Sequence, residues 1–167
     1  MEPKFIVDVN VGKLAKWLRM MGFDTSFFDE PDDGQMVKMA LAQDRIIVTK
    51  DTEFMKRRAI TSGRVKALLV SGDYSESQMD TVINKLDLSG KTRPFTRCLE
   101  CNAELKELDR KEAEGLVPGK VYEIQDQYMV CPSCRRVYWR GTHWKAMTNK
   151  LHEFESIPTE HNQGGRP

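Results

Sequence analysis

The chain has 167 residues, of which 40% are hydrophobic and 31% charged, a composition typical of a folded protein with one medium domain or two small ones. Its 26 basic and 25 acidic residues leave a formal net charge of +1, so any signal for nucleic-acid binding must be local. No apolar run is long enough to span a membrane, and the first residues lack the apolar core of a signal peptide. We therefore expect a cytoplasmic protein with no membrane partner.

The first 90 residues predict strands that alternate with helices. Short apolar or β-branched runs predict strands at residues 5–7, 25–28, 46–48 and 65–70. Helical spacing predicts helices at about 11–21, from 33, at 52–60 and from 75, where Ser75 and Gln78 match a capping box. Four short units of this kind indicate an α/β fold, with a parallel sheet covered by helices on both faces.

The alternating pattern stops near residue 90, and residues 92–96 predict a linker. All four cysteines lie beyond it. We therefore expect an α/β domain at residues 1–91 and a small β-rich domain at 92–154. Residues 155–167 contain Gly, Pro and polar residues with little to bury, which predicts a disordered tail.

The cysteines form two CxxC motifs, Cys98–Cys101 and Cys131–Cys134. Each motif offers two thiolates from one tight turn, and together they complete the tetrahedral shell that zinc prefers. Thiols stay reduced in the cytoplasm, which favours a metal over disulfides. Four thiolates leave no open position for a substrate, so the expected zinc is structural, in a zinc ribbon. Between the motifs, residues 120–124 predict a strand.

Acidic residues follow every predicted strand of the first domain. In chain order they are Asp8, then Asp29, Glu30, Asp32 and Asp33, then Asp51, and finally Asp73. The carboxyl ends of parallel strands meet at one edge of a sheet. If the first and third strands are neighbours, Asp8 and Asp51 lie close together, and two like charges in that position favour a bound cation.

Carboxylate oxygens suit Mg²⁺ or Mn²⁺, and such an ion can activate water for phosphodiester cleavage. A helix cap is the alternative role for Asp33 and Asp51, because each directly precedes a helix-like segment. Asn10 is predicted to cap the first helix, with a place beside the metal as its alternative.

The segment from Gln127 to His152 contains no acidic residue. It carries Arg135, Arg136, Tyr138, Trp139, Arg140, His143, Trp144, Lys145 and Lys150. Basic groups can contact phosphates and exposed aromatic rings can stack on unpaired bases, so we expect an RNA-binding surface here. The alternative is that the tryptophans pack the ribbon against the first domain. Lys13, on the first helix, could also help to seat a phosphate backbone.

Four segments carry a further signal: residues 5–25 (FIVDVNVGKLAKWLRMMGFDT), 45–51 (RIIVTKD), 97–102 (RCLECN) and 131–147 (CPSCRRVYWRGTHWKAM). Together they resemble the Mut-7 C-terminal RNase family, in which a PIN-like domain is fused to a zinc ribbon. The resemblance covers about residues 4–152. It implies a PIN-like fold and a metal-dependent ribonuclease activity.

The resemblance also implies roles for individual residues. Asp8 matches the first acid of the PIN-like site and Asp51 the acid after the TxD strand. Asp33 matches the acid that opens the second helix, with Asp32 as a possible substitute. These positions would hold Mg²⁺ or Mn²⁺. Asp73 is the expected fourth acid, and Glu53 is its rival.

The leading hypothesis is therefore a metal-dependent endoribonuclease, a hydrolase whose zinc ribbon binds RNA. Transfer RNA, ribosomal RNA and the ribosome are candidate partners. A second hypothesis is an RNA- or ribosome-binding protein whose PIN-like fold does not cleave. A third is the toxin of a toxin–antitoxin pair, which the attached ribbon disfavours.

Overall fold

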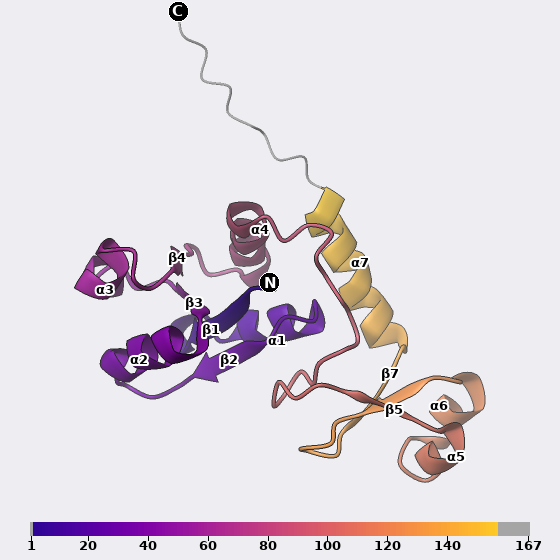
Figure 1. Ribbon diagram of the computed structural model, residues 1–167. Coiled ribbons are helices and arrows are strands. Elements are labelled where there is room, and N and C mark those ends of the chain that lie inside the picture. Colours follow the sequence, from indigo (N-terminus) through magenta and orange to yellow (C-terminus); the bar gives the residue numbers. More distant parts are fainter. Residues whose placement is uncertain (1, 157–167) are drawn as a thin grey trace, which may run out of the picture.

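The computed structural model describes residues 2–156, which form an α/β unit, a small antiparallel unit and a final helix (Figure 1). The first unit contains β1 (Lys4–Asp8), η1 (Val9–Val11), α1 (Lys13–Met20), β2 (Thr25–Phe28), α2 (Asp33–Gln43), β3 (Arg45–Thr49), η2 (Phe54–Lys56), α3 (Arg58–Thr61), β4 (Ala67–Leu69) and α4 (Ser75–Leu86). The second contains β5 (Lys106–Leu108), α5 (Arg110–Ala113), α6 (Gly119–Ile124), β6 (Tyr128–Val130) and β7 (Val137–Trp139), and α7 (Thr142–Ser156) follows. The tail predicted at 155–167 lies outside the described residues, apart from its first two residues, which belong to α7.

The first unit is a four-stranded parallel sheet in the order β2-β1-β3-β4. Side chains of β1 alternate between its two faces, so Phe5 and Val7 enter one buried cluster with α1 and α4. Ile6 enters the other cluster, with α2 and η2. Helices therefore cover both faces, and the predicted α/β fold is confirmed.

Helix α7 returns from the second unit to the first and lies beside α4 (Figure 1). Leu151 is buried in the same cluster as Phe5, and Trp144 and Met147 pack against that cluster. The domain boundary near residue 92 stays a prediction. Helix α7 lies beyond that residue in the chain, yet it completes the core of the first unit. In the stretch from residue 2 to 156, no helix combines the length and apolarity needed to cross a bilayer.

The second unit is a three-stranded antiparallel sheet in the order β5-β6-β7. The strand predicted at 120–124 is wrong, because these residues belong to helix α6. The amides of Val121 and Tyr122 both donate to the carbonyl of Pro118, which starts the helix. Val121 and Tyr122 then pack against buried Tyr128, and a short apolar run of this kind resembles a strand in sequence.

Two further local predictions are wrong. The helix expected at 52–60 is split into η2 and α3, because Arg57 between them has an extended backbone with ψ 138°. Ser75 and Gln78 form no capping box: Tyr74 is the N-cap of α4, and the Gln78 side chain donates to the carbonyl of Gly72 at 2.6 Å.

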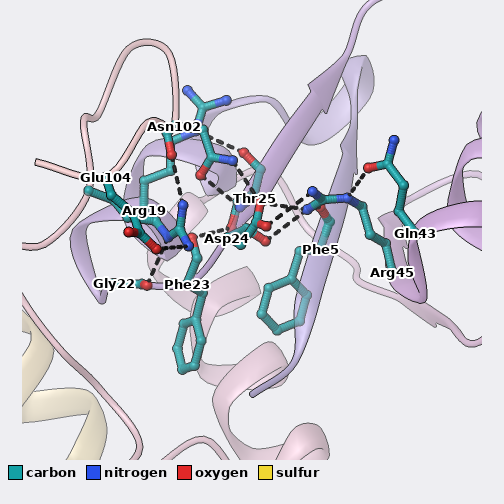
Figure 2. A network of polar contacts seen from close by, with 11 residues as sticks. Phe5, Arg19, Gly22, Phe23, Asp24, Thr25, Gln43, Arg45, Asn102 and Glu104 are labelled. Atoms are coloured by element: carbon teal, nitrogen blue, oxygen red, sulfur yellow. Dashed lines mark hydrogen bonds and ion pairs between the residues drawn. The ribbon is translucent and has the colours of Figure 1, made fainter. Parts of the chain in front are cut away.

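A polar network fastens the second unit to the sheet, with Asp24 at its centre (Figure 2). Arg45 approaches Asp24 with two nitrogens, at 2.7 and 3.1 Å. Asn102 donates to the same carboxylate at 2.7 Å and accepts from the amide of Thr25 at 2.9 Å. Burial raises the pKa of Asp24, but the hydrogen bonds from Arg45 and Asn102 outweigh it, and the pKa lies below its ordinary 3.8.

Asp24→Asn is expected to destabilise the protein at neutral pH by roughly 1–3 kcal/mol, because the neutral amide cannot pair with both nitrogens of Arg45. Since folding lowers the pKa of Asp24, its carboxylate stabilises the fold fully above pH 3.8, and this contribution is lost as the pH falls through the folded-state pKa. Urea denaturation at pH 7 and near pH 3 should therefore show a smaller loss of stability on acidification in the variant.

The matched control is Asp87→Asn, which changes an exposed carboxylate paired with Lys91 and should leave both measurements nearly unchanged. An acid sensitivity in Asp24→Asn equal to that of the wild type would contradict the role given to Asp24.

Candidate functional site

Two loops with the same backbone conformation carry the four cysteines. In each loop, the amide of the residue directly after the second cysteine donates to the carbonyl of the first cysteine at 3.0 Å. Asn102 donates to Cys98 in this way, and Arg135 donates to Cys131. Asn102 and Arg135 have φ values of 68° and 64°. The repeated turn aims both cysteines of each loop toward the other loop.

The four sulfur atoms form one compact cluster, in which all ligand atoms lie within 4.8 Å of one another. Cys98 lies 3.5 Å from Cys134, and Cys101 lies 3.4 Å from Cys131. Four convergent thiols are the donor set of a structural zinc site. The cluster could therefore hold zinc, and it fits the predicted zinc ribbon.

Tyr138 supports the cluster from β7. Its hydroxyl lies 3.0 Å from the sulfur of Cys98 and accepts a hydrogen bond from the amide of Leu99 at 3.2 Å. Burial raises the pKa of the Cys98 thiol, but hydrogen bonds from Tyr138 and from backbone amides outweigh it and lower the pKa to about 6. Cys98 thus favours the thiolate, which is the form that binds metal, whereas burial and the neighbouring cysteines raise the pKa of Cys134 to about 12.

Arg19, on α1, connects this first cysteine loop to the sheet. One guanidinium nitrogen donates to the carbonyls of Leu99 and Glu100, both at 2.9 Å, and Nε donates to the carbonyl of Thr25 at 2.9 Å. Only 7% of Arg19 is exposed. Burial lowers the pKa of Arg19, and the negative charge of a nearby Cys98 thiolate opposes that shift.

A second polar cluster lies at the carboxyl ends of the neighbouring strands β1 and β3. Asp8 Oδ2 accepts hydrogen bonds from Thr49 Oγ1 at 2.7 Å and from Asn10 Nδ2 at 2.8 Å. Thr49 Oγ1 in turn accepts from the amide of Asp51 at 3.1 Å. Asp8 and Asp51 are therefore joined through Thr49. We call Asp8, Asn10, Thr49 and Asp51 the strand-end cluster.

The structure changes the reading of two residues here. Asn10 does not cap α1, because Gly12 occupies the N-cap position and Asn10 lies inside η1. Thr49 was not among the candidate residues, although it stands between the apolar strand and Asp51 in sequence. Its side chain is fully buried, 0% exposed, and the sequence alone does not show this.

The other predicted acids are only partly brought together. Asp51 Oδ1 accepts from the amides of Glu53 and Phe54, at 2.8 and 3.1 Å, so it stabilises the turn that leads into η2, whose N-cap is Glu53. Asp33 pairs with Arg57 at 2.7 Å. Asp32, its neighbour, is the N-cap of α2 and accepts from the amide of Gln35.

Beside the strand-end cluster is an open groove of about 390 Å³. Its lining includes Asn10, Lys13, Lys50 and Asp73. The Asp73 side chain is 93% exposed and lies 3.7 Å from Lys50 Nζ. Glu53, its rival as fourth acid, is exposed and pairs with Lys56.

Among residues 2–153, whose side chains are described, the cysteines are the one group of three or more candidate metal ligands within 4.8 Å of one another. Asp8, Asp33 and Asp51 do not meet that distance as a group. Asp29 and Glu30, after β2, are exposed.

The basic segment covers β7 and the start of α7. Arg135, Arg136, Arg140, His143 and Lys145 are exposed. Trp144 packs edge-on against Phe95, with ring centroids 4.7 Å apart, and Arg140 lies over the other ring of that pair, 5.2 Å from the Phe95 centroid. Trp144 therefore has a structural role, as the packing alternative foresaw.

Zinc is expected at one ion per chain, measured by elemental analysis of protein purified without added metal. Cys131→Ser should lose most of this zinc and lower the melting temperature, because three thiolates remain for a four-ligand site. Ser133→Ala, between the same two cysteines, is the matched control and should retain both. Full zinc content in Cys131→Ser would rule out this ligand set.

Residues 3–151 match the family described as the Mut7-C RNAse domain. Searches of curated proteins and of solved structures returned no significant match. The family match covers both the parallel sheet and the cysteine cluster, and it bears out the resemblance noted from the sequence motifs. It suggests a ribonuclease-type function with RNA as the substrate. The chain belongs to the Mut7-C RNAse domain family.

Proposed function

We propose that the protein is a metal-dependent endoribonuclease whose chemistry takes place at the strand-end cluster. The observation that carries this proposal is the junction of Asp8 and Asp51 through Thr49, at the carboxyl edge where parallel sheets place functional groups. The description of the family as an RNAse domain supports the same reaction class.

The donor set at this edge suits a hard cation such as Mg²⁺ or Mn²⁺. In the described part of the chain, hydrogen bonds occupy Oδ2 of Asp8 and Oδ1 of Asp51, so each carboxylate keeps one oxygen for a cation. Magnesium is commonly held by one or two carboxylates together with waters and substrate phosphates. When bound, such an ion activates water and stabilises the charge that develops on the phosphate.

The chain's own residues would orient the reacting groups. Thr49 and Asn10 both donate to one oxygen of Asp8, which fixes the direction of its carboxylate. Lys13 and Lys50 line the adjacent groove, where their ammonium groups can bind the phosphates on either side of the scissile bond. Asp33 would join the site by exchanging Arg57 for the cation, and Asp73 would be the fourth acid.

The ribbon would grip the RNA. Its exposed Arg135, Arg136, Arg140, His143 and Lys145 suit contacts with the phosphate backbone, and zinc would keep the loops beneath them folded. Transfer RNA and ribosomal RNA are the candidate substrates, in the cytoplasm.

A second candidate is an RNA- or ribosome-binding protein that does not cleave. Two contacts favour it: Asp33 is held by Arg57, and Asp51 caps a turn. In this case the basic residues of the ribbon would carry the function, and the strand-end cluster would stabilise the sheet edge.

Asp8→Asn is expected to reduce cleavage of a mixed RNA in the presence of Mn²⁺ by roughly 100-fold or more, since the amide loses the charge that binds the cation. Cleavage would be followed on gels, and RNA affinity by filter binding, where the variant should match the wild type. Equal cleavage by both proteins would remove Asp8 from the site. Binding by the wild type without cleavage under any divalent metal would favour the second candidate.

Asp33 and Asp32 provide a matched pair of adjacent acids. Asp33→Asn should lower cleavage roughly tenfold, because it removes a carboxylate that would help to hold the cation. Asp32→Asn should have little effect, because asparagine caps a helix as well as aspartate does. Rates measured with saturating and limiting Mn²⁺ would show whether the loss is in metal affinity. The reverse order of effects would transfer the role to Asp32.

A further inference from the structure

An aromatic pocket of about 210 Å³ lies where β7 passes into α7. The side chains that line it include Leu99, Tyr138, Trp139, His143, Trp144 and Met147. It is separate from the groove beside Asp8, with which it shares no lining residue. Its size and aromatic walls suit a flat, unsaturated ring.

The pocket is held in shape from behind. Trp144 packs edge-on against Phe95, and Tyr138 is fixed by the amide of Leu99 and the sulfur of Cys98. A Cβ atom at Gly141 would lie 2.8 Å from Nε1 of Trp139, so glycine at this position lets the indole approach the backbone. Walls positioned in this way lose little freedom when a ring enters between them.

The charges around the pocket complement a nucleic-acid backbone. Arg136 and Lys145 are exposed and directly adjoin the lining residues Val137 and Trp144 in sequence, on a segment with no acidic residue between Gln127 and His152. The neighbouring acid, Glu100, is engaged by Lys16 at 2.8 Å and faces Arg136 at 3.8 Å. An anionic ligand would therefore meet positive charge at the rim and aromatic surface inside.

We propose that this pocket binds one unpaired nucleobase of RNA, while the basic residues at its rim bind the flanking phosphates. A base within a duplex cannot enter such a pocket, whereas an unstacked base can lie on aromatic side chains. The inference rests on the proposed function and narrows its substrate to RNA that has an unpaired nucleotide close to the cleavage site.

Helix α1 connects the pocket with the groove beside Asp8. Lys13 lines that groove, and Lys16, one helical turn later, reaches Glu100 of the first cysteine loop. Leu99, the residue before Glu100, lines the aromatic pocket. If RNA phosphates replaced Glu100 as the partner of Lys16 and Arg136, these two residues and Lys13 could contact the RNA backbone between the base in the pocket and the strand-end cluster.

Tryptophan fluorescence can locate the base, because stacking quenches the indole. The experiment titrates full-length protein with an eight-nucleotide single-stranded RNA, with a blunt duplex of the same sequence, and with versions carrying one abasic site. We expect quenching by the single strand that Trp139→Phe largely removes. Trp17→Phe is the matched control, since Trp17 packs on the first core and does not line the pocket.

Affinity gives the second readout. His143→Ala, at an exposed position, should weaken single-strand binding several-fold, and one abasic position should weaken it roughly 5- to 150-fold. Equal affinity for single strand and duplex, or the same quenching in Trp139→Phe as in wild type, would overturn the proposal. So would a concentration-dependent change in Trp139 fluorescence without RNA, which would show a second copy of the chain in the pocket.

These outcomes are separable from those of the cleavage assay. Base-dependent quenching without cleavage would support the pocket and defeat the nuclease proposal. Cleavage that depends on Asp8 but is equally fast for single-stranded and duplex RNA would support the nuclease proposal and defeat the pocket.

Discussion

The placement of the cysteine ribbon depends on polar groups that would be costly to bury alone. Arg19 is almost wholly enclosed, and its guanidinium is satisfied by three carbonyl oxygens, two of them inside the first cysteine loop. Asn102, directly after Cys101, adds a hydrogen bond to Asp24. Because each donor needs a defined acceptor, these bonds allow one orientation of the ribbon where apolar packing would tolerate several.

Metal binding and the sheet are consequently connected through backbone atoms. The carbonyls that receive Arg19 belong to the two residues enclosed by Cys98 and Cys101. Zinc bound by the four thiols would hold this loop in the geometry that presents those carbonyls. Because the same guanidinium also donates to the carbonyl of Thr25, a shift of this loop would be transmitted to strand β2.

Much of the fold could be predicted from local patterns. The β-branched run of β3 reflects one physical requirement, the burial of its side chains. The spacing of the cysteines reflects another, the tetrahedral arrangement of thiolates that suits zinc. The strand prediction for residues 120–124 was wrong although Val121 and Tyr122 favour strands in sequence. The turn at Pro118 and packing in the small core of the second unit make these residues helical. Thr49 and Asn102 gave no signal, since their roles depend on partners 41 and 78 residues away. The positions of the acids at strand ends were predictable, but their competing partners, such as Arg57 for Asp33, were not.

The return of α7 to α4 has a consequence for the order in which the protein is built. Phe5, near the start of the chain, and Leu151, near the end of the described part, belong to one buried cluster. During synthesis, the parallel sheet can form early with α1 and α4, but the part of its core that Leu151, Trp144 and Met147 cover stays open to solvent until α7 has left the ribosome. Contacts between such distant parts of a chain slow folding. The nascent first unit therefore has an interval in which this apolar patch beside α4 is available to chaperones, and a chain that ends prematurely within the ribbon would keep the patch exposed.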